Sequence, residues 1–462
     1  MTQNQIFSTS WPRKISYSIA TFGSAAVGGT LTTFAFFFYK EVVYKDLIGV
    51  SAENQFWILT LLGTALAIGW WIQALMNPVA GWLSDKLVST RFGRRKPWLL
   101  LGSPVIAISF IAIFMIPAPA TDIFFPIVWL AVFNGIYNAA YAATFVVYLA
   151  VIPEICQTPE ERTSISTYRQ GFSLVGFVLG VIIGAFVEFN VFIVVILAGF
   201  MFICLYITVF GIKEPEGVPE TPTFGIVEAL KVTFRNKPFL PYLGYTIFAT
   251  AFQEMMIRVL PIFGREIIYK GKEVEISSYI PGAFVVTAFL SLIPAMFWIN
   301  RVGKKKAVIY SLVVAAVLAS LLFTVGMIPF DPLIHTLIIV LLIGFPAAPL
   351  LVLPDSIISD ITDYDEIVTG TRREAMHFAS QGLLTRFSGG VSVQLLGLIL
   401  GIFGSSYGEP SLISTIIPGL PTTLGVSLIG PVAAIILFIG LLIFWKYPED
   451  EVLGASGKKL QT

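Results

Sequence analysis

The chain has 462 residues, of which 56% are hydrophobic and 14% are aromatic, whereas only 12% are charged. Soluble domains carry about one-quarter charged residues, so most of this surface must face lipid rather than water. The net charge of +1 provides no general attraction to nucleic acid, and nucleic-acid binding is not expected. With two cysteines and two histidines, the composition predicts neither a disulfide framework nor a structural metal site, and no cofactor is expected.

Apolar runs long enough to cross a bilayer core of roughly 30 Å recur along the whole chain. In the first half they predict helices near residues 15–39, 55–84, 97–117, 121–152, 164–187 and 190–212. After a polar, proline-containing stretch, they predict helices near residues 238–267, 276–300, 306–328, 331–359, 376–404 and 422–446. No polar segment is long enough for a sizeable soluble domain, so the expected function takes place in or across the membrane.

These helices divide the chain into an N-terminal six-helix bundle (1–212), a cytoplasmic linker (213–237) and a C-terminal six-helix bundle with a tail (238–462). Apolar residues of the linker recur at helical spacing, which favours a short amphipathic helix on the membrane surface over a merely solvated connection. These apolar positions are Phe224, Val227, Leu230 and Phe234.

The distribution of basic residues predicts that both termini are cytoplasmic, because cytoplasmic loops carry an excess of Lys and Arg. Of the 29 Lys and Arg residues, this topology leaves outside only Lys40, Lys45, Arg265, Lys270 and Lys272. Residues 91–96 read Arg-Phe-Gly-Arg-Arg-Lys, and residues 301–306 read Arg-Val-Gly-Lys-Lys-Lys. A shared glycine at equivalent points of the two halves favours duplication over charge bias alone, and two related bundles around a cavity suit alternating access.

Two longer motifs extend this pattern. The first comprises Asn77, Pro78, Gly81, Trp82 and Asp85, followed by Gly-Arg-Arg-Lys-Pro-Trp at residues 93–98. The second, between the tenth and eleventh predicted helices, comprises Asp360, Asp363, Tyr364, Asp365, Glu366, Gly370, Arg372, Arg373 and Glu374.

Together the motifs resemble the glycoside-pentoside-hexuronide cation symporters, the melibiose-carrier-like branch of the major facilitator superfamily, over nearly the whole chain. The resemblance implies an all-α membrane protein of the major facilitator fold, with twelve transmembrane helices in two pseudo-symmetric six-helix bundles. It also implies cation-coupled transport of a sugar or sugar-like solute.

Both motifs place carboxylates beside basic residues at the cytoplasmic ends of helices that must separate when the inner side opens. Ion pairs that form in one state and break in another can shift a conformational equilibrium, so we expect a cytoplasmic gate. The alternative is an ordinary inside-positive topology signal with acidic neighbours. The expected gate residues are Asp85, Arg94, Arg95, Asp360, Asp363, Arg372 and Arg373.

The chain departs from the family pattern at four acidic positions. The resemblance places Gln73 and Asn77 where sodium-coupled relatives hold the cation between two aspartates, and Ala25 and Phe145 where they bind sugar. Gln and Asn offer carbonyl oxygens without negative charge, so a sodium site of the usual kind is not expected.

Proton coupling is favoured over sodium because Glu254 lies near the middle of the seventh predicted helix, with Arg258 one turn further on. A carboxylate in hydrocarbon is costly unless it is paired or takes up a proton. The alternatives are a permanent structural ion pair and an exposed position at the outer mouth.

Arg169 and Arg386 match basic family positions, the first implicated in sugar binding by the resemblance. Without opposing acids they make an anionic solute a candidate: a uronate, a sulfonated or phosphorylated sugar, or a lipid head group. Alternatively, each arginine reaches the inner interface with its charged end.

Two helices carry polar and aromatic stripes that are expected to line the cavity. The alternative is a helix-packing seam in which amide and phenol groups bond between helices. The expected binding residues are Asn134, Asn138 and Tyr141 on the fourth helix and Trp70, Gln73 and Asn77 on the second.

The expected partners are therefore a small-molecule solute, a coupling cation and the lipid bilayer of a plasma or inner membrane, with the protein acting as a monomer. A lipid or lysolipid carrier of the same fold is the alternative within transport, and a non-transporting membrane sensor is the alternative outside it. An enzyme is not expected, because the sequence has no phosphate loop, acid-rich metal motif or nucleophile constellation.

Overall fold

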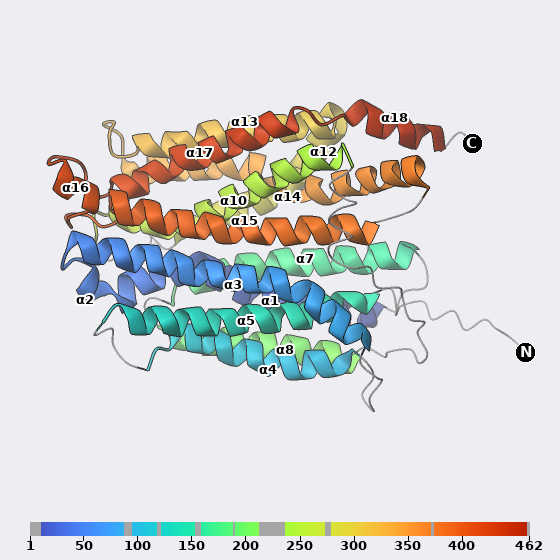
Figure 1. Ribbon diagram of the computed structural model, residues 1–462, viewed down its shortest axis with the longest axis horizontal. Helices are drawn as coiled ribbons and strands as arrows, with labels where there is room; N and C mark the ends of the chain where they lie inside the picture. Colours follow the sequence, from blue (N-terminus) through green and yellow to red (C-terminus); the bar gives the residue numbers. More distant parts are fainter. Residues whose placement is uncertain are drawn as a thin grey trace, which may run out of the picture. The chain divides into compact units, whose positions relative to one another are not determined.

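The computed structural model describes residues 11–86, 95–117, 122–152, 159–187, 190–211, 236–272, 279–370 and 374–459. Within these ranges the regular structure is entirely helical, as predicted (Figure 1). The amphipathic helix predicted at residues 224–234 lies outside the described part of the chain.

Helices of the first half follow the predicted order closely. They are α1 (Trp11–Phe38) with the π-helical η1 (Tyr39–Val43), α2 (Lys45–Ile48), α3 (Ala52–Lys86), α4 (Lys96–Phe114), α5 (Phe124–Ala150), α7 (Pro159–Gly184) and α8 (Phe192–Gly211). The second half begins with α10 (Phe239–Phe263), the π-helical η2 (Gly264–Ile268), α11 (Ile280–Leu290) and α12 (Leu292–Val302). It continues with α13 (Lys304–Leu321), η4 (Leu322–Thr324), α14 (Pro332–Thr369), α15 (Glu374–Phe403), α16 (Leu412–Ile416), α17 (Leu424–Phe444) and α18 (Glu449–Lys459).

Eleven spans of the described residues are long and apolar enough to cross a membrane, and the bent pair α11–α12 makes a twelfth. The predicted count of twelve is confirmed. The single helix expected at 276–300 is, however, bent by 48° between α11 and α12. Pro294 lies in the first turn of α12, where its ring lacks an N–H and crowds the carbonyl of Leu290, so one straight helix cannot continue through this point.

The tenth span is longer than the apolar run that predicted it. Helix α14 continues past residue 359 to Thr369 and ends at Gly370, which adopts the left-handed conformation with φ 73°. The acidic residues of the second motif, Asp360 and Asp363 among them, therefore lie on a helix and not in a loop. Hydropathy marks where a helix leaves the membrane, whereas the helix itself ends where a glycine allows the chain to turn.

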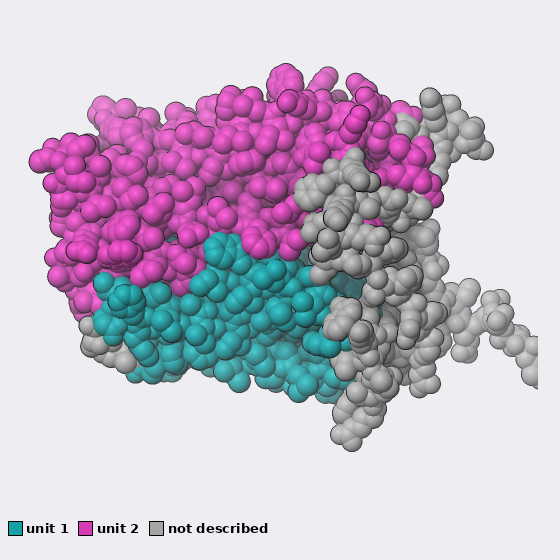
Figure 2. Space-filling model, viewed as in Figure 1, with its two compact units in different colours: residues 1–38, 68–223 teal, residues 39–67, 224–462 magenta. Residues whose placement is uncertain are grey.

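The contacts divide the chain into two compact units, one of residues 1–38 and 68–223 and the other of residues 39–67 and 224–462 (Figure 2). The second unit thus includes residues 39–67, which are the end of the first span and the start of the second. In each half of the chain the first and fifth spans pack against each other: α1 against α7 in the first half, and α10 against α15 in the second half.

In the first unit, α7 lies so close to α1 that glycines are required. A Cβ atom at Gly176 would meet the carbonyl oxygen of Phe22, and one at Gly180 would meet that of Ala26. One turn further along, the Thr30 hydroxyl donates to the Gly180 carbonyl at 2.7 Å. Small residues and hydroxyls are what allow helices to pack closely in lipid.

In the second unit, α15 meets α10 at the equivalent carbonyls. Ser388 Oγ donates to the Ile247 oxygen at 2.7 Å, and Ser392 Oγ donates to the Ala251 oxygen at 2.6 Å. When Tyr17 of α1 is aligned with Tyr242 of α10, Ile247 and Ala251 fall on Phe22 and Ala26.

Other hydrogen bonds repeat in the same alignment. The Tyr17 hydroxyl donates to the backbone of α5 at 2.7 Å, and the Tyr242 hydroxyl donates to the backbone of α14 at 3.0 Å. Thr21 and Thr246 each donate to the carbonyl three residues earlier. The two halves are therefore duplicated in their internal packing and not only in their loop motifs.

The close approach of α1 and α7 predicts that Gly180→Ala destabilises the protein. The added methyl group must displace the Ala26 backbone, which costs about 1–3 kcal/mol by overpacking. We expect a thermal unfolding midpoint in detergent several degrees lower than that of the unchanged protein. The control is Gly171→Ala on the same helix, where nothing lies within 4 Å and a neutral or stabilising effect is expected. Equal midpoints for the two variants would contradict the seam.

Candidate functional site

An aromatic ladder runs along α5 in the first unit. The rings of Tyr141 and Phe145 stack with centroids 4.3 Å apart, and Tyr137 and Tyr148 extend the row on either side. At the Tyr148 end, the ring stacks on Tyr17 of α1 at 4.4 Å. The two phenols are also locked together, because each hydroxyl donates to the other residue's backbone oxygen.

Arg169 of α7 lies at the same end of the ladder. Its guanidinium is close enough to the Tyr148 phenol to act on it electrostatically, and its backbone oxygen accepts a hydrogen bond from Thr21 at 3.0 Å. The Arg169 Nε atom is buried and has no hydrogen-bond partner among the described residues. Tyr17 and Tyr148 are fully buried, so within the ladder it is the half-buried Tyr141 that, with the guanidinium, can meet a ligand combining an anionic group with an apolar or sugar-ring face.

The two asparagines of the predicted stripe face α3. A Cβ atom at Gly69 would collide with the side-chain amides of both Asn134 and Asn138, so these residues fill the seam between α3 and α5. Asn138 Nδ2 donates to the Asn134 backbone oxygen at 2.8 Å and to its side-chain oxygen at 2.9 Å. Gln73, one turn from Gly69, is buried as well. The asparagines thus make the helix contact that the packing alternative expects, and their role in binding stays a prediction.

The remaining predicted binding residues are less buried than the asparagines and Gln73. Trp70 and Asn77 are half-buried on α3, in the first unit. Arg386 is half-buried on α15, in the second unit. The structure thus brings Arg169 and Tyr141 together around Tyr148, whereas it groups the asparagines with α3.

Glu254 and Arg258 form the predicted pair on α10. Arg258 Nη1 bonds to the Glu254 carboxylate and also donates to the Glu254 backbone oxygen at 2.9 Å. The Arg258 side chain is almost fully buried, and that of Glu254 is 16% exposed. The carboxylate is thus paired but is not completely enclosed by the described residues.

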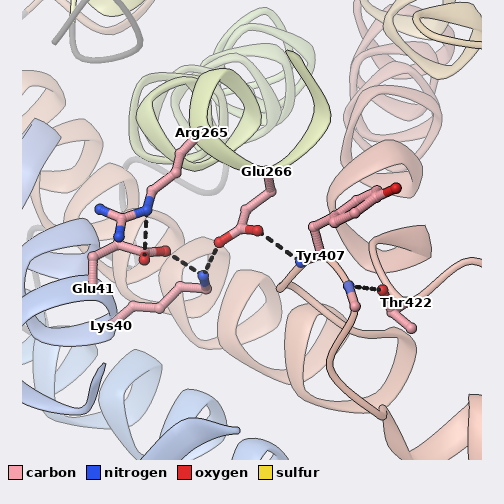
Figure 3. Close-up of polar contacts among 7 residues, drawn as sticks. Lys40, Glu41, Arg265, Glu266, Tyr407 and Thr422 are labelled. Carbon is pink, nitrogen blue, oxygen red and sulfur yellow. Dashed lines mark hydrogen bonds and ion pairs between the residues drawn. The ribbon is translucent and has the colours of Figure 1, made fainter. Parts of the chain in front are cut away.

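A second group of buried charges was not anticipated from the sequence. Lys40 and Glu41 of η1 meet Arg265 and Glu266 of η2 within the second unit, with the side chains pointing toward one another (Figure 3). We call these four residues the ionic quartet. A signal for it exists in the sequence, because residues 40–45 read Lys-Glu-Val-Val-Tyr-Lys and residues 265–270 read Arg-Glu-Ile-Ile-Tyr-Lys.

At the opposite, predicted cytoplasmic, end the second unit has its own ion pairs. Lys304 Nζ lies 2.5 Å from Asp360 Oδ2, which pairs α13 with α14. The Lys305 backbone N–H donates to Glu449 Oε1 at 2.8 Å, and its Nζ donates to the Tyr447 backbone oxygen at 2.6 Å, so α13 also contacts the start of α18 and the residues just before it. Burial raises the pKa of the Tyr447 phenol, and the nearby carboxylates of Asp360 and Glu449 raise that pKa further.

The expected gate residues are only partly described. Arg95 is buried and donates to the Ser84 hydroxyl at 2.6 Å, and Asp363 is half-buried on α14. Among the described residues, Asp360 pairs with Lys304 of α13. Outside the described structure lie Arg94, Arg372, Arg373 and the side chain of Asp85.

Comparison with known proteins agrees with this architecture. A family described as MFS/sugar transport protein matches residues 16–451. The chain belongs to this family, the glycoside-pentoside-hexuronide branch of the major facilitator superfamily.

Among relatives of this branch, the sodium-dependent lysophosphatidylcholine symporter 1 of Gallus gallus is 23% identical over 94% of this chain and 87% of its own length. The isoprimeverose transporter of Lactiplantibacillus pentosus is also 23% identical, over 85% and 81% of the two chains. The solved structure of the nucleoside transporter NupG has a TM-score of 0.65 at 15% identity, with 94% of this chain and 99% of that chain covered. That likeness shows the fold alone.

Membership of the glycoside-pentoside-hexuronide branch identifies the chain as a multi-pass membrane transporter and not an enzyme. Its partners are a small-molecule solute and a coupling cation. The predicted family, fold class and transport role are confirmed, whereas the roles of the individual site residues remain predictions.

The pair of Lys304 and Asp360 predicts a reciprocal effect on stability. Lys304→Asp faces two acids toward each other and, because the pair is only partly exposed, is expected to cost about 0.5–1 kcal/mol. The double variant Lys304→Asp with Asp360→Lys restores opposite charges, so most of the lost thermal midpoint should return. Lys306→Asp, at an exposed neighbouring position, serves as the control. A double variant no more stable than the single one would refute the pairing.

Proposed function

We propose that this protein is a secondary active transporter that moves an anionic, sugar-like solute by alternating access, with proton rather than sodium coupling. The observation that carries the proposal is Arg169, a half-buried cation beside the Tyr148 end of the aromatic ladder, whose Nε has no partner among the described residues. The guanidinium supplies charge-assisted hydrogen bonds in a fixed plane, and the half-buried Tyr141 of the ladder supplies a ring against which a sugar ring can lie.

Arg169 favours an anion because its buried Nε has no partner among the described residues, which is costly, and a bound anionic group would remove that cost. A uronate or a phosphorylated or sulfonated sugar carries such a group together with a ring. The branch also has a member named as an isoprimeverose transporter, which supports a sugar-like substrate class.

A lysolipid is the second candidate, and it is favoured by a specific observation. Relatives from Gallus gallus, Mus musculus and Homo sapiens are named sodium-dependent lysophosphatidylcholine symporters, and each aligns with 94% or more of this chain. The phosphate of a lysophospholipid would bind the same arginine, and its acyl chain would lie against the half-buried Tyr141.

Proton coupling is proposed from Glu254 and Arg258. When Glu254 is ionised, it holds Arg258 through both its carboxylate and its backbone oxygen. Protonation would weaken the bond to the carboxylate and leave the bond to the backbone oxygen, so Glu254 holds Arg258 with different strength in its two protonation states. Such a difference is what couples an ion gradient to a conformational equilibrium.

Uptake into liposomes tests substrate and coupling together. The purified protein is reconstituted and offered neutral sugars, acidic sugars or lysophosphatidylcholine, under a proton gradient alone and under a sodium gradient alone. We expect accumulation of acidic sugars under the proton gradient. Accumulation of lysophosphatidylcholine would establish the lipid carrier, and stimulation by sodium alone would overturn the coupling assignment.

Arg169→Gln is predicted to weaken apparent affinity for the transported anion about tenfold or more, because a charged hydrogen bond of about 1.5–3 kcal/mol is lost. Arg169→Lys keeps the charge but loses the planar fork, so an intermediate effect is expected. The half-saturating solute concentration is measured in liposomes, with Arg301→Gln, at an exposed position, as the control. Unchanged affinity in Arg169→Gln would remove this residue from the binding site.

Glu254→Gln is predicted to abolish uphill accumulation while leaving solute exchange intact. The amide cannot release a proton, so the gradient is uncoupled, whereas the solute site on the other unit of the chain is untouched. Counterflow and gradient-driven uptake are compared in the same liposomes, with the exposed Glu53→Gln as the control. Normal accumulation in Glu254→Gln would exclude Glu254 from coupling.

A further inference from the structure

The ionic quartet is a closed, buried and neutral set of charges. Lys40 Nζ lies 2.7 Å from Glu266 Oε1 and also bonds to the Glu41 carboxylate, and Arg265 Nε lies 3.0 Å from Glu41 Oε2. The four residues are between 1% and 8% exposed. Two acids and two bases in so little water are stable only while each acid has a basic partner.

Both halves of the duplicated chain contribute equally to the quartet. When the sequences of the two halves are aligned with Tyr17 on Tyr242, Lys40 corresponds to Arg265 and Glu41 to Glu266. Each pair also occupies a π-helical segment directly after the helix of its half. Such segments are rare and frequently mark functional sites, because they interrupt the regular helix hydrogen bonding.

The bonds across the quartet join residues 39–67 to the second half of the chain. Lys40 with Glu266 and Arg265 with Glu41 are contacts between η1 and η2, whereas Lys40 with Glu41 is a contact within η1. The Tyr407 backbone N–H, in the connection after α15, donates to Glu266 at 2.7 Å, and the next residue is held by the Thr422 hydroxyl (Figure 3). Three segments of the second unit therefore meet at the quartet.

Every segment of the quartet is neutral by itself. If η1 moved away from η2, Glu41 would keep Lys40, and Glu266 would have Arg265 beside it. Opening would then leave Lys40 with Glu41, to which it is already bonded, and make Arg265 the partner of Glu266, without leaving an unpaired charge on either segment. A lock with both bases on one side and both acids on the other would leave opposite net charges when it opened and would resist opening far more.

We propose that the ionic quartet is a partner-exchange latch, which holds the predicted outer end closed through pairs between η1 and η2 and lets it open through pairs within each segment. The latch rests on the proposed alternating access. It assigns to these four residues a conformational role that is separate from solute binding and from coupling at Glu254.

Two double variants of identical composition test the latch. Glu41→Arg with Arg265→Glu preserves opposite charges across the quartet and keeps Glu266 as the acceptor for Tyr407, but it places like charges side by side within each segment, so the open state is penalised. Lys40→Glu with Glu41→Lys keeps η1 neutral but sets the new acid against Glu266 and the new base against Arg265, so the closed state is penalised. A latch predicts opposite effects, whereas a merely structural cluster predicts the same loss in both.

Opening is read from a buried thiol. Ser405→Cys is a conservative reporter, because Ser405 is fully buried, lies two residues before Tyr407 and has an Oγ with no hydrogen-bond partner among the described residues. In a background with Cys156 and Cys204 replaced by alanine, a membrane-impermeant maleimide should label the reporter about fivefold or more slowly in the first double variant. It should label the reporter about fivefold or more quickly in the second.

Changes in the same direction in both double variants, or unchanged labelling in both, would overturn the latch. If the second double variant does not fold, Lys40→Gln with Glu41→Gln serves instead, since it removes both pairs between η1 and η2 but leaves each segment neutral, and it should also speed labelling. Slower or unchanged labelling in this variant, with a lower thermal midpoint, would refute the proposal. Labelling requires no solute, so failure of the proposed substrate in uptake assays remains distinguishable from failure of the latch.

Discussion

Charge burial is the constraint on which this structure most depends, because an ionised side chain in hydrocarbon costs several kcal/mol unless it is paired. Arg258 is held by Glu254 through side chain and backbone, and the ionic quartet balances two acids with two bases. The same constraint governs neutral groups: the hydroxyls of Ser388 and Ser392 bond to backbone oxygens of the facing helix. Arg169 departs from it, since its buried Nε has no partner among the described residues. That departure is why the ligand proposal centres on Arg169.

Because the two halves are duplicated, the first and fifth spans of each half pack against each other at equivalent positions, although through different residues. The seam between first and fifth span uses glycine in one unit and serine in the other, at equivalent backbone oxygens. Glycine allows the backbones to touch, whereas serine fills a slightly wider gap with a hydrogen bond. Where both halves keep the same chemistry, as at Lys40–Glu41 and Arg265–Glu266, the two copies meet each other. Retained similarity at that point fits a function that needs both copies.

The sequence predicted the helices well, because a membrane span is marked by its own apolar length. It did not predict the extension of α14 to Thr369, since charged residues such as Asp360 end a hydrophobic run without ending a helix. The stripe on α5 was recognised, but only the position of Gly69 on α3 shows which of its residues face a neighbouring helix. The ionic quartet was missed because Lys40 and Arg265 read as ordinary charges of outer loops, and burial of a charge depends on partners distant in sequence.

The central claim is that residues 39–67 separate from the second half when the predicted outer end opens. Pulsed electron resonance between spin labels at Val50 and Ile416, which are 67% and 68% exposed, measures this separation directly within the second unit. In lipid nanodiscs the account predicts two distance populations, with their ratio changed by saturating transported solute. A single narrow distance that solute does not alter would contradict it.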